Sequence, residues 1–183
     1  MDEDWEVRPN SERIEWILDP LAGVGPLRFG MESVEVSEVL SGVTQEPQQL
    51  VVRHLPNGRQ IGTVGRYWEF GLKLFYDPQG KLEGVSADGA LGPRIFVEGV
   101  PLSGRVPSEL ERWIVDRANT EYAEDDFELW HLGRGIPGSS SLGLVINVQR
   151  VADHLITRPV MFAEHVLDDP SNILPEEAWK ITA

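Results

Sequence analysis

The chain contains no cysteine among its 183 residues. Disulfide bonds, thiolate catalysis, cysteine-ligated zinc and iron–sulfur clusters are therefore excluded. Histidine is also scarce. The four histidines do not occur in the His-x-His or His-Glu-x-x-His spacing that places two metal ligands on one face. We therefore predict no metal site and no bound cofactor.

The sequence also lacks a basic, apolar leader and a long hydrophobic run. Met1 is followed by Asp2, Glu3 and Asp4, whereas a secretory signal has a positively charged start before an apolar stretch. No apolar run approaches the roughly 18 residues that a membrane-spanning helix needs. We expect a cytoplasmic protein that does not associate with membranes.

Positive charge is sparse. The chain has 16 Lys and Arg against 30 Asp and Glu, which gives a formal net charge of −14 and a pI near 4.6. Such a field repels nucleic acid and anionic membranes, and it speeds the encounter with basic proteins. The candidate partner-binding residues are two groups of carboxylates, for which a plain solvated surface is the alternative: Glu121, Glu124, Asp125, Asp126 and Glu128 in one connection, and Asp168 and Asp169 near the C-terminus.

The stretch Gly25–Met31 has the pattern of a strand end and a glycine corner that lead into a short helix. In that helix the apolar residues recur at i, i+3 and i+4 from Val36, which makes one apolar stripe. We predict Glu32 as the N-cap, with Glu35 at the third helical position, and an end near Gly42.

A second helix entry resembles the first. Gly104 is followed by Pro107, which suits a first helical position, and then by an apolar stripe at Leu110, Trp113 and Ile114. Placing Gly104 on Gly30 aligns the two stripes, so the pattern indicates an internal repeat. Its alternative is a chance likeness between two amphipathic helices.

Most other segments alternate or carry turn signals typical of strands. They predict an α+β fold, in which two short helices pack on an antiparallel β-sheet as one domain (residues 1–183). Two tandem α-then-β units with halves at 12–98 and 99–167 are compatible with the same pattern, as is a loop-rich tail at 168–183 with one helical turn at 175–179. The predicted strands are 14–18, 50–55, 67–76, 81–87, 94–97, 127–132, 142–148 and 159–166.

No motif in the sequence predicts a defined catalytic chemistry. Gly133–Gly138 matches G-x-G-x-x-G, but an apolar strand follows where a dinucleotide-binding motif needs a helix, so we interpret it as a β-hairpin loop. Gly138–Gly143 does not form a nucleophile elbow. A fold that joined His131, His165 and a carboxylate as acid and base, or one of these histidines with a carboxylate, would allow a small hydrolase. We assign no catalytic residue.

Several stretches resemble small acidic immunity proteins of bacterial polymorphic toxin systems, particularly of actinobacteria. The similar segments, within residues 14–118, are Val24–Met31 with Glu35–Val36 and Val39–Leu40, then Tyr67–Val85, and Gly104–Leu110. The chain has Glu32 where such proteins usually have Ser or Thr. The resemblance implies a protein that acts by binding, so it transfers no catalytic residue.

The leading hypothesis is therefore an immunity protein that occludes a cognate toxin domain. A nuclease toxin is often basic because it binds phosphates, and an acidic inhibitor can mimic that ligand. The alternatives are the small hydrolase above and a structural or regulatory adaptor.

Overall fold

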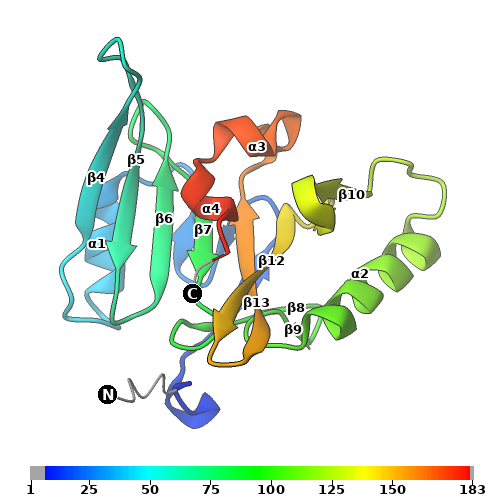
Figure 1. Cartoon of the computed structure of the whole chain (residues 1–183). Coiled ribbons are helices and arrows are strands. Elements are labelled where there is room, and N and C mark those ends of the chain that lie inside the picture. The colour runs from blue at the N-terminus through cyan, green and yellow to red at the C-terminus, as the bar shows by residue number, and fades with distance from the viewer. Residues whose placement is uncertain (1–6, 182–183) are drawn as a thin grey trace.

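A computed structural model of the chain describes residues 7–181, apart from the side chain of Arg134 (Figure 1). The strands form two sheets, an eight-stranded one in the order β10-β11-β12-β13-β7-β6-β5-β4 and a five-stranded one in the order β3-β2-β1-β8-β9. The large sheet consists of β4 (Gln49–His54), β5 (Gln60–Tyr67), β6 (Leu72–Tyr76), β7 (Leu82–Ala87), β10 (Leu129–Leu132), β11 (Ile136–Ser139), β12 (Leu144–Val151) and β13 (His154–Phe162). The small sheet consists of β1 (Glu15–Asp19), β2 (Gly23–Val24), β3 (Leu27–Arg28), β8 (Arg94–Val97) and β9 (Val100–Pro101).

The chain is an α+β protein built as two helix-then-strands units. Helix α1 (Ser33–Leu40) precedes the meander β4–β7, and helix α2 (Pro107–Glu121) precedes the meander β10–β13. The two meanders join through their last strands, because β13 pairs antiparallel with β7. Every pair in the large sheet is antiparallel, as the sequence predicted, whereas β1 and β8 of the small sheet pair in parallel. Both predicted halves contribute strands to both sheets.

The glycines of the two helix entries have the same conformation. Gly30 has φ +94° and Gly104 has φ +70°, and a helix begins three residues after each. Other residues rarely adopt this left-handed region, so glycine allows the chain to turn into the helix. As predicted, Glu32 is the N-cap of α1, and its backbone N–H donates to the Glu35 carboxylate at 2.7 Å.

Both helices cover one face of the large sheet. A core of apolar side chains joins α1, α2, the small sheet and this face, and its members include Trp16, Leu40, Leu74, Ile114 and Met161. In Figure 1 helix α1 lies behind β4 and β5, on the side away from the viewer. We call this the helix-side face.

The C-terminal tail covers the opposite face of the sheet, which we call the tail-side face. The tail comprises three short helices, η3 (Glu164–Asp168), α3 (Pro170–Ile173) and α4 (Glu176–Trp179), so the predicted helical turn is confirmed. Leu174 and Ala178 are buried against sheet residues such as Phe75 and Phe162 in a second apolar cluster. The segment expected to be loop-rich therefore forms the second half of the core, because this face is too apolar to be left in water.

Most predicted strands have bounds that differ by one to three residues, and two of them differ in kind. Residues 67–76 form a hairpin, because Gly71 has φ +71° and the chain reverses between β5 and β6. The strand predicted at 159–166 starts earlier and ends at Phe162. The Ala163 N–H then donates to the Glu83 carbonyl, and η3 turns Val166 back into the core, so His165 is not on a strand. Helix α1 is capped by Ser41, one residue before the predicted Gly42.

Two further short 3₁₀ helices, η1 (Asn10–Glu12) and η2 (Gly133–Gly135), complete the regular structure of the described residues. The first half of the G-x-G-x-x-G stretch, in η2, connects the hairpin strands β10 and β11, as predicted, whereas residues 136–138 belong to strand β11 itself. No helix within residues 7–181 is long and apolar enough to cross a membrane.

Candidate functional site

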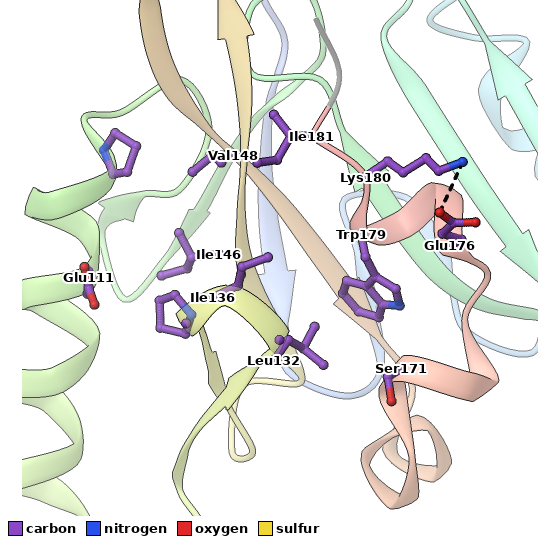
Figure 2. Close-up of a pocket in the computed structure, with 14 residues that line it drawn as sticks. Glu111, Leu132, Ile136, Ile146, Val148, Ser171, Glu176, Trp179, Lys180 and Ile181 are labelled. Atoms are coloured by element: carbon purple, nitrogen blue, oxygen red, sulfur yellow. Dashed lines mark ion pairs between the residues drawn. The ribbon is translucent and has the colours of Figure 1, made fainter.

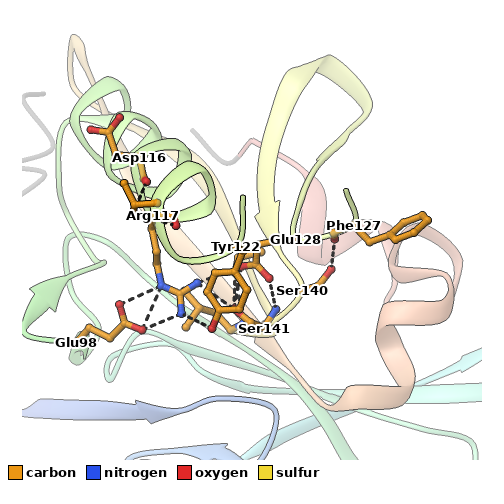
Figure 3. A network of polar contacts seen from close by, with 11 residues as sticks. Glu98, Asp116, Arg117, Tyr122, Phe127, Glu128, Ser140 and Ser141 are labelled. Atoms are coloured by element: carbon orange, nitrogen blue, oxygen red, sulfur yellow. Dashed lines mark hydrogen bonds and ion pairs between the residues drawn. The ribbon is translucent and has the colours of Figure 1, made fainter. Parts of the chain in front are cut away.

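The acidic connection follows α2 and leads into β10. We use this name for residues 121–127. The carboxylates of Glu121, Glu124, Asp125 and Asp126 are exposed, and the Phe127 ring beside them is 83% exposed. In Figure 3 the Phe127 side chain points away from the polar network at the root of the connection. Protein interfaces are enriched in aromatic residues and depleted in Asp and Glu, so the exposed Phe127 ring is the feature that marks this surface as a candidate binding site.

Glu128 differs from the other predicted acidic residues because it is only 2% exposed. Its Oε1 accepts hydrogen bonds from the hydroxyls of Ser139 at 2.5 Å and Ser141 at 2.8 Å, and its Oε2 accepts one from the Ser141 N–H at 2.9 Å. Arg117 Nη1 lies 3.1 Å from Oε1. Both carboxylate oxygens are therefore occupied inside the protein, and Glu128 offers neither to a partner.

Arg117 connects Glu128 with a second carboxylate. Its Nε and Nη2 donate to Glu98 at 2.8–3.1 Å, and its guanidinium stacks 4.8 Å from the centre of the Tyr122 ring. Glu98 can reach α2 because it sits in the β8–β9 hairpin with φ +52°, followed by Gly99 with φ +76°, as a type I′ turn requires. Burial lowers the pKa of Arg117, but the hydrogen bonds to Glu98 and its negative charge raise the pKa by more. The pKa of Arg117 therefore lies above its ordinary value.

This network fixes the base of the acidic connection. The Ser140 N–H donates to the Glu128 carbonyl, and the Ser140 hydroxyl donates to the Phe127 carbonyl at 2.6 Å. Asp125 Oδ1 accepts the Phe127 N–H at 2.9 Å, so one carboxylate of the connection also shapes its backbone. The exposed side chains are consequently presented from a rigid base, which lowers the entropy lost when a partner binds.

The second predicted acidic group lies elsewhere. Asp168 is the last residue of η3, Asp169 is the N-cap of α3, and both are exposed. The Asp169 carboxylate accepts hydrogen bonds from Asn172 at 2.7 Å and Ser171 at 3.1 Å, which lower its pKa. No hydrogen bond or ion pair in the described part of the chain joins this group to the acidic connection, and β10 lies between the two in Figure 1. Asp169 thus has a structural role at the start of α3.

The structure does not bring the two candidate histidines together. His165 Nε2 lies 2.9 Å from the buried carboxylate of Glu83, on the tail-side face. His131 alternates along β10 with Trp130 and Leu132, which pack under the tail, so it faces the other way. A shared acid–base site with both histidines is therefore excluded by the fold.

A groove of about 470 Å³ runs along the edge of the large sheet between α2 and α4 (Figure 2). Apolar residues of β12 form its floor, and the Glu176 carboxylate at its rim is paired with Lys180 at 3.3 Å. The other lining carboxylate, Glu111, lies on α2 across the groove from Glu176 (Figure 2). The lining residues labelled in Figure 2 are Glu111, Leu132, Ile136, Ile146, Val148, Ser171, Glu176, Trp179, Lys180 and Ile181.

Within residues 7–181 no group of three or more His, Asp or Glu side chains is arranged to hold a metal ion. No protein-family model matches the chain, and no curated protein or solved structure is significantly similar to it. The geometry of the site therefore has to support the functional argument by itself.

Arg117 and Phe127 were not predicted from the sequence. Strand alternation gave no signal for the burial of Glu128, because this residue lies in the turn before β10. Its cationic partner is Arg117. No local pattern indicates that the partner comes from α2.

Proposed function

We propose that the chain is a binding protein of the immunity type, which neutralises a cognate bacterial toxin domain by occluding it in the cytoplasm. The observation that carries this proposal is the acidic connection, where Phe127 lies exposed among carboxylates on a fixed base. Interface energies concentrate in a few aromatic and charged residues, and preorganised ones lose the least entropy on binding.

The partner that fits this surface is a basic protein with an apolar recess. The net charge of −14 accelerates its approach, and among the described residues the carboxylates of Glu121, Glu124 and Asp126 form no ion pair within the chain. A nuclease toxin has such a basic surface because it binds phosphates. Phe127 would then occupy the recess while the carboxylates meet the surrounding cations.

The test is co-expression with the toxin domain encoded by the neighbouring gene. Cells that make both proteins should grow, and cells that make the toxin alone should die. The charge-reversal pair Glu124→Lys and Asp126→Lys should remove protection. A matched pair, Glu12→Lys and Glu38→Lys, changes the net charge equally at exposed positions elsewhere and should leave protection intact.

If cells die equally fast with and without the protein, the proposal fails. If both charge-reversal pairs lose protection equally, toxin binding depends on net charge and the acidic connection is not the site. A direct affinity measurement with the purified toxin domain distinguishes the two results, since only site-specific binding depends on which carboxylates are reversed.

A further inference from the structure

Unpartnered polar groups gather on the tail-side face. Within the described residues, five buried side-chain atoms have no hydrogen-bond partner, and every one of them is a donor. Four belong to strands of the large sheet with side chains on the tail-side face, and the fifth belongs to α4, which covers that face. Buried donors in folded proteins normally have hydrogen-bond acceptors, so a group of unpaired donors on one face requires an acceptor from outside the chain. The five atoms are Arg53 Nε, Arg66 Nε, Ser86 Oγ, Arg158 Nε and Trp179 Nε1.

Strand register brings several of these donors into one row. Arg66 lies opposite Lys73 on the next strand, and Lys73 lies opposite Ser86 on the strand after that. Ser86 in turn pairs with Val160 on β13, two residues from Arg158 on the same face. Neighbouring strands are about 4.8 Å apart, so the row extends over about 14 Å of backbone from β5 to β13, and only the long Arg and Lys side chains allow its ends to reach one small group. We call Arg66, Lys73, Ser86 and Arg158 the cationic row.

The positive charges of the row have no carboxylate within ion-pair distance among the described residues. Arg66 lies 5.2 Å from the centre of the Trp68 ring, and Arg158 Nη2 donates to the carbonyls of Ala178 at 3.4 Å and Lys180 at 2.5 Å. Neither contact neutralises a charge. This is unexpected in a chain with almost twice as many acidic as basic residues.

Two carboxylates face the row at longer range. Asp88 and Glu177 raise the pKa of Lys73, yet burial and the neighbouring Arg158 and Arg66 lower it by more. Asp88 Oδ1 is already occupied, because it accepts the N–H groups of Ala90 and Leu91 at 2.8 Å and the Gln149 amide at 3.2 Å. The electrostatic environment therefore disfavours the charged ammonium unless another anion is present.

We propose that the cationic row binds a small oxyanion, the phosphate or carboxylate group of a small-molecule ligand. Two guanidinium groups, an ammonium and a hydroxyl supply donors from four neighbouring strands on one face, and charge-assisted hydrogen bonds to such a group are the strongest available. Ser86 and Arg158 are 2% and 3% exposed, whereas Arg66 and Lys73 are half-buried, so the row opens to solvent on its β5–β6 side. The site lies on the tail-side face, and its existence does not depend on toxin binding.

The experiment titrates the purified full-length chain with sodium phosphate and, separately, with sodium succinate, each against sodium chloride at equal ionic strength. Chemical shifts of backbone amides and the melting temperature are measured. We expect a saturable change centred on β5, β6 and β7 with at least one of the two anions. Lys73→Met should weaken this binding by at least about tenfold, since it removes a charge-assisted contact.

Arg112→Met is the matched control, because Arg112 is exposed on α2 and its loss changes the net charge equally. This variant should bind the anion as the unmodified chain does. Lys73→Met should remain folded, because it removes a charge that burial disfavours. A response to phosphate alone identifies a phosphate site, a response to succinate alone a carboxylate site, and a response to both a general oxyanion site.

The proposal is overturned if neither anion causes a saturable change, or if Lys73→Met responds as the unmodified chain does. Phosphate also stabilises folded proteins without binding, because it is excluded from their surface. That effect does not saturate and moves Lys73→Met and Arg112→Met equally, so it cannot be mistaken for the site.

Discussion

Two clusters of buried positive charge differ in whether a carboxylate of the chain compensates them. Arg117 is enclosed by Glu98 and Glu128, and its nitrogens donate to both carboxylates. Lys73 and Arg158 on the tail-side face are also buried or half-buried, yet they have no carboxylate within ion-pair distance among the described residues. In the first cluster the chain itself supplies the compensating carboxylates, so we assign the cluster a structural role. In the second cluster the described part of the chain supplies none within ion-pair distance, so we assign it a role in binding.

The comparison predicts opposite effects when a buried cation is removed. Arg117→Met should lower the free energy of unfolding by about 3–5 kcal/mol, because it leaves the Glu128 carboxylate buried without its cation. Urea denaturation measures this loss. The double variant Arg117→Met with Glu128→Gln should recover part of it, since the uncompensated charge is gone. If the single variant is as stable as the unmodified chain, Arg117 does not stabilise the fold by compensating Glu128.

In the second cluster the same kind of change should stabilise the fold. In anion-free buffer, Lys73→Met should raise the free energy of unfolding by about 1 kcal/mol, because an apolar side chain of similar length avoids the cost of burying an unpaired charge. Denaturation in parallel with Arg112→Met, which should change stability by less than about 0.5 kcal/mol, provides the reference. A loss of stability in Lys73→Met would contradict the contrast between the clusters.

Glu83 is an intermediate case, a buried carboxylate whose partner His165 is exposed. Burial raises the pKa of Glu83 above 4.5, although the hydrogen bond from His165 opposes the shift. The folded state therefore holds this proton more tightly than the unfolded state. The resulting stability is fully present below pH 4.5 and is lost as the pH rises through the raised pKa.

Glu83→Gln should remove this loss, so that the stability of the variant varies less with pH between about pH 4 and about pH 7. His165→Ala should shift the loss toward higher pH, because it removes the interaction that favours the carboxylate. Denaturant midpoints measured across this range test both expectations. Parallel pH profiles for Glu83→Gln and the unmodified chain would show that Glu83 is not the group responsible.

The smallest effect on stability is expected at the rim of the first cluster. Phe127→Ala should change the free energy of unfolding by less than about 0.5 kcal/mol, because the ring is 83% exposed. Under the proposed function the same change should weaken toxin binding by about 2 kcal/mol, roughly 30-fold. Calorimetry with the purified toxin domain measures the binding. An unchanged affinity would remove Phe127 from the interface while leaving the stability comparison intact.

Much of the local structure could be predicted from the sequence. The glycine corners at Gly30 and Gly104, the N-cap at Glu32 and Pro107 at the first helical position each determine the conformation of their own neighbourhood, and the structure confirms them. After each entry the structure has a helix and then a four-stranded meander, the order that the predicted repeat requires. The prediction was wrong where one apolar run contains the ends of two strands, as at the Gly71 turn between β5 and β6. Such a run does not show where the chain reverses direction.

The candidate site was only partly predictable. Exposure of Glu124 and Asp126 follows from their position in a polar connection, whereas burial of Glu128 depends on Arg117 and on two serines of the next hairpin. The cationic row was not predicted at all. Arg66, Lys73 and Ser86 come from three strands, and Arg158 comes from a strand of the other unit.

The sequence by itself determined the acidic charge, the absence of cysteine chemistry, the α+β class and the two helix entries. These depend on composition and on interactions between residues a few positions apart. Only the tertiary structure decided which charges are compensated, because β7 and β13 join the two units and place Ser86 beside Val160. Whether a buried cation has a carboxylate or requires an external anion therefore depends on sheet order, which a local pattern does not contain.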